Sequence, residues 1–250
     1  TKRGFVLHHN WVVNTPMETG LADAEKASKA LKTAEKFRNN FGMYVTGIDR
    51  SASSDKAESY AAKVGKSEFT YTGTVMTLPT GVQAISSSNY GLPNEAYDLV
   101  QRMLRTFSFA LPGSMYEVSP DYGMMTQAWN SYAFEVPVIQ QFFGIQPLAY
   151  KKEIVIKPSL PKALTNGKIE NVPIGSNEIS IGFVQKATKD QFAITQKSTG
   201  WSVVFSQPKG KYKKWVVNNR TVAPKLVGDY EQITLSRKMN TYPQALINKI

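Results

Sequence analysis

The sequence lacks cysteine altogether, which excludes disulfides, catalytic thiolates and cysteine-ligated metal sites. Histidine is almost as scarce. The two copies, His8 and His9, are adjacent, so a histidine-rich zinc site or a Ser-His-Asp triad would have to use this pair. No apolar run approaches the roughly 18 residues that cross a bilayer, so no membrane partner is expected. A cysteine-free, lysine-rich chain fits an exported bacterial protein, and a periplasmic or secreted location is the expectation.

A composition of 42% hydrophobic and 20% charged residues in 250 is typical of a globular protein with a sizeable core. The formal net charge of +11 is unevenly placed: residues 1–150 hold 13 basic and 13 acidic side chains, and residues 151–250 hold 17 and 6. The basic residues of the second part are mostly scattered lysines. They indicate a solvent face that discourages pairing of strand edges, with no nucleic-acid partner. The alternative is an acidic partner, such as a uronate, a sulfated glycan or DNA.

Helical periodicity dominates the first part of the chain. Apolar residues recur every three or four positions after Leu21, with Asp23 as a candidate cap and Gly42 beyond the helix end. Further helices are predicted over 80–91, 94–111 and 122–143, and Pro137 should kink the last one.

After Pro147 the pattern changes to short β-branched runs separated by Gly, Pro, Asn and Lys, which is typical of an antiparallel β-sandwich. The predicted fold class is therefore mainly α then β. Helical hairpins occupy residues 1–147, and an antiparallel β-sandwich follows over 148–250.

Three loops combine aromatic residues with carboxylates or amides, as sugar sites do. They are "HHNWVVNTPMETG" at 8–20, "GMYVTGIDR" at 42–50 and "MYEVSPDYG" at 115–123. Each notable residue also has a structural interpretation. Trp11 could be a core anchor, Glu18 could form a capping box with Thr15, Asp49 could pair with Arg50, Asp121 could cap a helix, and Trp129 could belong to an apolar helix stripe that also holds Tyr132.

Glu117 has no such structural explanation, because it precedes Ser119-Pro120 and lies too early to cap the helix that follows. A glutamate beside aromatic residues outside regular structure suits proton transfer. It is therefore the candidate catalytic residue.

Together these stretches resemble the six-hairpin glycosidases, the (α/α)6-barrel superfamily of glucoamylases, debranching-type amylo-α-1,6-glucosidases and α-L-rhamnosidases. The resemblance is carried by "NWVVNTPMETGLAD", "FGMYVTGIDR", "TLPTGVQAISSSNYGLPNEA" and "GSMYEVSPDYGMMTQAWNSYAFEVPVIQQFFGIQPLAYKKEIVIKPSLP". The last stretch looks like a final barrel hairpin that leads into a β-sandwich.

The resemblance implies hydrolysis of an α-linked oligo- or polysaccharide by two carboxylates, in the inverting manner, with Glu117 as the general base. The same interpretation places seven further residues in the substrate pocket: Trp11, Glu18, Tyr44, Asp49, Tyr116, Asp121 and Trp129. Carboxylates and aromatic rings suffice for this chemistry, so no cofactor and no metal are expected.

The sequence departs from the family pattern in two respects. A full barrel has twelve helices, whereas four or five are predicted here, and the segment that bears the general acid would lie upstream. The chain is therefore expected to be the C-terminal part of a (α/α)6 toroid, completed by the rest of its own polypeptide or by a homo-oligomer. Two other functions stay open: a noncatalytic carbohydrate-binding or structural module, and a lyase or phosphorylase on a related toroid.

Overall fold

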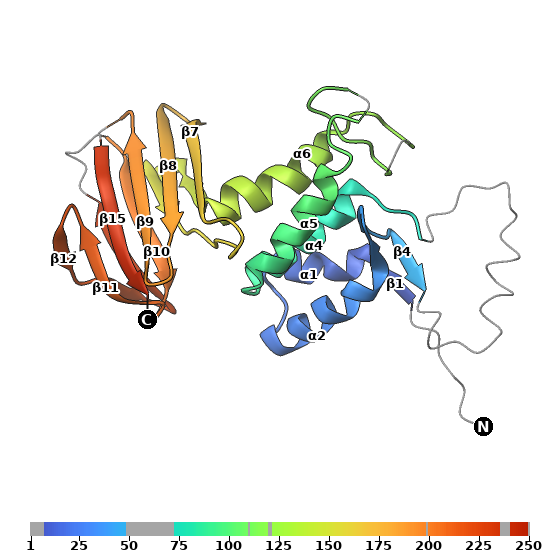
Figure 1. Cartoon of the computed structure of the whole chain (residues 1–250), viewed down its shortest axis with the longest axis horizontal. Helices are drawn as coiled ribbons and strands as arrows, with labels where there is room; N and C mark the ends of the chain where they lie inside the picture. Colours follow the sequence, from blue (N-terminus) through green and yellow to red (C-terminus); the bar gives the residue numbers. More distant parts are fainter. Residues whose placement is uncertain are drawn as a thin grey trace, which may run out of the picture. The chain divides into compact units, whose positions relative to one another are not determined.

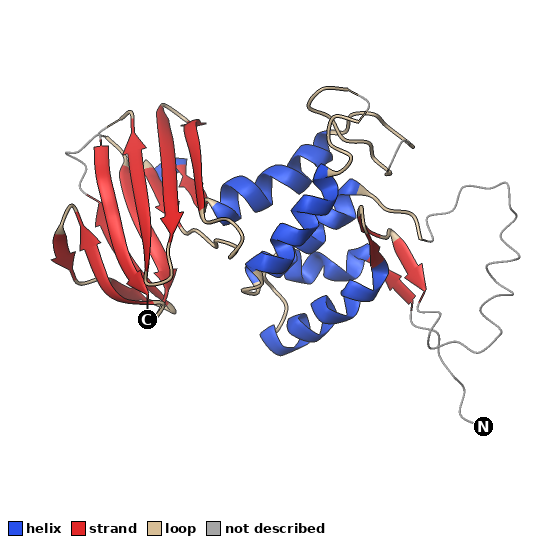
Figure 2. Ribbon diagram, in the orientation of Figure 1, coloured by secondary structure: helices blue, strands red, loops and turns tan. Residues whose placement is uncertain are grey.

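The computed structural model describes residues 8–48, 73–109, 111–119, 122–198, 200–235 and 241–249. The chain divides into two compact units, Thr1–Pro137 and Val138–Ile250 (Figure 1). Figure 2 shows that helices dominate the first unit and strands the second. Among the described residues, no helix is both long enough and apolar enough to cross a bilayer.

The first unit is a helical body with short strands. Its elements follow in chain order: β1 His8–Asn10, η1 Trp11–Asn14, α1 Thr15–Glu18, α2 Ala24–Ala34, η2 Glu35–Phe37, β2 Arg38–Asn39, β3 Gly42–Met43, β4 Thr46–Ile48, α4 Thr77–Asn89, α5 Pro93–Leu104 and α6 Ala128–Glu135. Helix α4 is buried along almost its whole length and contacts α1, α2, α5 and α6. It is the central element, around which the others pack.

Helix α2 forms as its sequence predicts. The Asp23 carboxylate accepts hydrogen bonds from the backbone N–H groups of Glu25 and Lys26, both at 3.1 Å, and thereby caps the helix start. The apolar residues at three- and four-residue spacing turn inward: Ala27, Leu31, Ala34 and Phe37 are all buried.

Close contact between α4 and α6 depends on a glycine. A Cβ at Gly81 would lie 2.2 Å from the Cβ and 2.3 Å from the Cα of Ala133, so only glycine permits this approach. The helical "TGVQAIS" stretch therefore uses Gly81 as a packing residue rather than as a breaker.

Two helices differ from their predicted extents. Helix α5 ends at Leu104, short of the expected break at Pro112. Helix α6 begins only at Ala128 and continues as a π-helix over Val136–Phe142, where Pro137 disrupts the regular hydrogen bonding. The expected apolar stripe on this helix is wrong at two positions, because Trp129 is 49% and Tyr132 40% exposed. The described part of the chain holds five α-helices.

The second unit contains two sheets of five and six strands. Their strands are β5 Ile145–Leu148, β6 Glu153–Ile156, β7 Asn166–Ile174, β8 Asn177–Gln185, β9 Lys189–Gln196, β10 Ser202–Pro208, β11 Tyr212–Val217, β12 Arg220–Val222, β13 Lys225–Val227, β14 Tyr230–Leu235 and β15 Thr241–Lys249. The strand orders are β13-β14-β10-β6-β5 and β12-β11-β15-β9-β8-β7. All pairs are antiparallel except β10 with β6, which is parallel. The sandwich-like region thus follows the prediction, with one parallel pair that the sequence pattern did not indicate.

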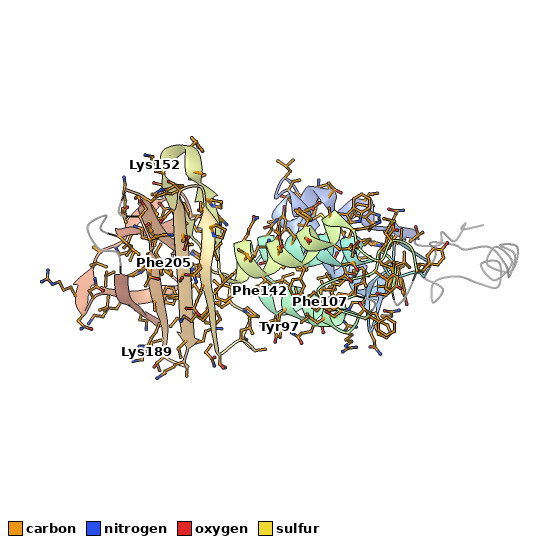
Figure 3. All side chains as sticks on the ribbon, turned by 90° about the horizontal axis from the view of Figure 1, so that it is seen from above. Tyr97, Phe107, Phe142, Lys152, Lys189 and Phe205 are labelled. Atoms are coloured by element: carbon orange, nitrogen blue, oxygen red, sulfur yellow. The ribbon has the colours of Figure 1, made fainter. Side chains whose placement is uncertain are left out.

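The core of this unit comes from alternating inward residues. On β8, Ile179, Ile181 and Phe183 are buried. Phe205 on β10, labelled in Figure 3, packs against Trp215 with ring centroids 6.0 Å apart. Phe143 and Ile145 from "FFGIQP" belong to the same core.

Candidate functional site

The three loops predicted to carry the site meet at the N-terminal end of α4. The Trp11 N–H donates to the Val45 carbonyl at 3.1 Å, which joins the first loop to the second. Met76 pairs with Val118 in an isolated β-bridge, which joins the start of α4 to the third loop. Residues far apart in the sequence are therefore brought to one end of the helical unit.

An apolar cluster fixes this junction. Val45, Met76 and Val118 are buried together, and the half-buried Trp11 packs against them. Trp11 therefore helps to anchor this cluster, which is the structural role that the sequence also allowed for it. The anchor belongs to the same junction as Glu117, whose neighbour Val118 lies in the cluster.

Glu117 is held by its backbone and by its side chain. Its N–H donates to the Met124 carbonyl at 2.8 Å, and its carbonyl accepts from the Thr77 N–H at 3.1 Å. The Oε2 atom accepts a further hydrogen bond from the Met124 N–H at 3.2 Å. The side chain is half-buried. We call residues 114–119 and 122–127 the Glu117 loop. The hydrogen bonds of Glu117 place its carboxylate on the surface of this loop.

A glycine makes this loop possible. Gly123 has φ +79°, a left-handed conformation that favours glycine. A Cβ at this position would lie 2.6 Å from the Glu117 Oε2. Gly123 therefore allows the chain to double back against the carboxylate and to present the next N–H to it.

The Glu117 loop is braced from both sides. The Thr77 hydroxyl at the start of α4 donates to the Tyr116 carbonyl at 2.8 Å. From α6, the buried Asn130 side chain donates to the carbonyls of Met115 at 2.8 Å and Tyr116 at 3.2 Å. Asn130 is thus a positioning residue that the sequence analysis missed. Its only signal is a polar residue at an inward position of "QAWNSY".

Glu18 lies toward the opposite end of α4 from Glu117. The side chain of Asn89, the last residue of α4, donates to the Glu18 carbonyl at 2.7 Å. The twelve steps from Thr77 to Asn89 correspond to about 18 Å of helix. The structure therefore does not bring the backbones of Glu18 and Glu117 together.

The Glu18 carboxylate has a partner of its own. It accepts a hydrogen bond from the Tyr132 hydroxyl at 2.6 Å. Burial raises the pKa of Tyr132 above its ordinary value, and the Glu18 carboxylate raises it further. The capping box is wrong, because Asn14 is the N-cap of α1 and Thr15 lies inside the helix.

The remaining predicted pocket residues are placed as follows. Tyr44 is half-buried, and its N–H donates to the Phe37 carbonyl at 2.8 Å beside the junction. Trp129 lies on the surface at the start of α6 and donates its indole N–H to Gln127. Asp49 and Asp121 lie outside the described residues.

A buried polar network lies behind the first loop. The Asn14 side chain donates to the Gln83 side chain, and both residues are buried. His9 stacks on Phe37 with centroids 4.8 Å apart, and burial lowers the pKa of His9, an effect that the Asn14 side chain partly offsets. Within the described ranges, no group of three or more His, Asp or Glu residues is arranged to hold a metal.

No protein-family model matches the chain, and no curated protein matches it. Among solved structures, the fold is similar to that of an α-L-rhamnosidase from Dictyoglumus thermophilum, with a TM-score of 0.55 and 13% sequence identity. The match covers 97% of this chain and 25% of the rhamnosidase chain. The chain spans about a quarter of that protein's length, and at this identity the similarity concerns the fold alone. The fold is accordingly a glycosidase-like one, distantly similar to that of part of an α-L-rhamnosidase.

Proposed function

We propose that this chain belongs to a six-hairpin glycoside hydrolase that cleaves an α-linked oligo- or polysaccharide with inversion. Glu117 is the general base that activates water, and the general acid is supplied by another part of the polypeptide. The helical unit is part of an (α/α)6 toroid, and the β-sandwich over 148–250 is an accessory domain. The fold shared with a rhamnosidase supports the class of activity.

The position of Glu117 is the observation that carries the proposal. Its carboxylate lies where three loops converge and is fixed by the Met124 N–H. A general base must be held within hydrogen-bonding reach of the water that it deprotonates. With Oε2 already bound to the backbone, Oε1 is the oxygen assigned to the water.

We assign the role of partner acid to a residue other than Glu18. Inverting enzymes place their two carboxyl groups about 6.5–9.5 Å apart across the glycosidic bond. The Glu18 carbonyl is bound at the end of α4 that lies about 18 Å along the helix from Thr77, and the Glu18 carboxylate is bound to Tyr132. It is therefore assigned to the structure of the α1–α6 contact.

Substrate binding is assigned to the aromatic residues beside the base. Tyr44 and Tyr116 flank the junction, and Trp129 offers an exposed indole at the start of α6. Sugar rings stack on such surfaces while hydroxyls bond to amides and carboxylates. Asp49 and Asp121 keep their predicted substrate contacts as part of this proposal.

Hydrolysis of a panel of α-glucosides, α-rhamnosides and polysaccharides tests the assignment. The assay compares three proteins: the chain alone, a polypeptide extended to include the rest of the proposed toroid, and the Glu117→Gln variant of that extended polypeptide. Glutamine keeps the shape but cannot accept the proton, so kcat should fall by several orders of magnitude with little change in substrate affinity. Hydrolysis that tolerates glutamine would refute the role of Glu117.

A noncatalytic carbohydrate-binding module is the second candidate. The observation in its favour is that the Glu117 carboxylate already accepts a hydrogen bond from a backbone N–H group. It could accept a hydrogen bond from a sugar hydroxyl in the same way. In that case Glu117→Gln should change glycan affinity, and neither form should hydrolyse the panel.

A further inference from the structure

A cavity of about 510 Å³ lies beside the Glu117 loop in the helical unit. Its walls come from the segment after α5, from both arms of the Glu117 loop and from α6. The side chains that the argument needs are Phe107, Met115, Gln127, Asn130, Phe134 and Glu135.

The cavity is close to the proposed base because the chain connects them. Met115 lines it and precedes Glu117 by two residues, and Thr126 lines it and follows Met124 by two residues. Two residues span at most about 7 Å. The two arms that hold the carboxylate therefore continue directly into the cavity wall.

One side of the cavity is aromatic. The rings of Phe107 and Phe134 are stacked, with centroids 5.8 Å apart and an angle of 23° between their planes. Phe107, labelled in Figure 3, is 41% exposed, so its ring remains available to a ligand. An exposed aromatic wall of this kind suits the apolar face of a flat, ring-shaped ligand.

The other lining groups are polar. Ser114, Ser131 and Gln127 supply hydroxyl and amide groups. The Asn130 Oδ1 is buried and accepts no hydrogen bond from any residue that the structure describes. Because this oxygen is closed off from solvent, contact with ligand hydroxyls is assigned to Gln127 and Ser131, which also line the cavity.

The charge of the lining narrows the ligand class. Glu135 is its single charged side chain among the described residues, and none of them is basic. An anionic sugar or a phosphate would find no cation here and would be repelled by Glu135. A neutral ring that carries hydroxyl groups satisfies both the aromatic and the polar wall.

We propose that this cavity is a binding subsite for one neutral pyranose unit of the substrate. The inference rests on the proposed function, which it deepens by naming the substrate class as uncharged. Phe107 and Phe134 form the platform, and Gln127 and Ser131 face the hydroxyls.

Calorimetric titration of the whole chain with methyl α-L-rhamnoside, methyl α-D-glucoside and D-glucuronate tests the subsite. At least one neutral glycoside should bind and glucuronate should not. Phe107→Ala should weaken neutral binding by roughly 2- to 12-fold. Phe109→Ala is the matched control, because Phe109 is exposed nearby but does not line the cavity. This variant should bind the neutral glycosides with unchanged affinity.

Glu135→Gln should narrow the preference for neutral over anionic sugars. The subsite is refuted if neither neutral glycoside binds, if glucuronate binds as well as they do, or if Phe107→Ala and Phe109→Ala behave alike. The outcome is separable from that of the proposed function. Neutral binding that depends on Phe107, without hydrolysis that depends on Glu117, would retain the subsite and remove the hydrolase.

Discussion

Replacing Gly123 by alanine should damage catalysis much more than folding. The added Cβ would lie 2.6 Å from the Glu117 Oε2, about 0.8 Å short of ordinary van der Waals contact. It would also lie 3.1 Å from the Glu117 Cβ, so the whole side chain has to shift. A carboxylate can move without disturbing the core, so the cost to stability is mainly that of φ +79° in alanine, about 1–2 kcal/mol.

The expected catalytic cost follows from displacement of Glu117, the proposed base. A shift approaching 1 Å breaks the 3.2 Å bond from the Met124 N–H and misaligns the carboxylate with its water. Such misplacement costs about 100-fold in kcat. The assay measures hydrolysis by the extended polypeptide that carries the Gly123→Ala change, and the melting temperature is measured in parallel.

Gly91→Ala is the control for backbone strain. Gly91 has φ +77°, and a Cβ there would meet nothing within 4 Å. Both variants should therefore melt alike, and only Gly123→Ala should lose activity. If the two variants hydrolyse the substrate equally well, the fixed position of Glu117 is irrelevant to the reaction.

Three further predictions concern stability. Gly81→Ala should lower the melting temperature of the helical unit by roughly 5 °C. The new Cβ would clash with the Ala133 backbone at 2.3 Å, and this cost outweighs a gain of about 1 kcal/mol in helix propensity. An unchanged melting temperature would show that α4 and α6 can move apart at no cost. Because the pKa of His9 is lowered in the folded state, the unfolded state takes up the proton first as the pH falls. The free energy of unfolding should therefore be constant above about pH 6.5 and decrease below it, by at most about 1.4 kcal/mol per pH unit. Chemical denaturation between pH 7 and 5.5 should show no such decrease in His9→Gln and an unchanged decrease in His8→Gln. Tyr212→Phe should destabilise the β unit by about 3 kcal/mol in urea, because it removes the O–H that donates to the buried Asp190 at 2.8 Å, whereas Tyr150→Phe, 80% exposed, should have no effect.

Elements governed by local periodicity could be predicted from the sequence. Helix α2 has both signals, a capping Asp23 and inward apolar residues at helical spacing, and it forms accordingly. The strands β8 and β10 follow their β-branched runs in the same way. Their side chains settle the structure of each segment without information from elsewhere in the chain.

Features that depend on distant contacts could not be predicted. Trp129 sits in an apolar stretch and yet lies on the surface, because α6 turns Asn130 and Ala133 inward instead. Asn130 is placed there to bind the carbonyls of the Glu117 loop, a purpose visible only once that loop is folded. The parallel pairing of β10 with β6 likewise leaves no trace in the alternation of either strand.

Of the candidate site, the sequence could predict which loops to consider but not how they are arranged. Residue types drew attention to the three loops and to Glu117, and the structure joins those loops at the start of α4. The distance between Glu18 and Glu117 depends on the length of α4, which separates residues that the sequence places in similar loops. Composition can select candidates, but the packing of α1 against α4 determines which of them meet.

The hydrogen bond between Glu18 and Tyr132 also bears on the proposed mechanism. Inversion needs a second carboxyl group about 6.5–9.5 Å from the base, and Glu18 is committed to Tyr132. The Glu117 loop meanwhile leaves Tyr122, Met124 and Met125 at least half exposed beside the base. Large apolar side chains that gather in this way mark a surface that another group covers. Under the proposed mechanism, one segment of the polypeptide that covers these side chains and also carries the acid would satisfy both requirements at once.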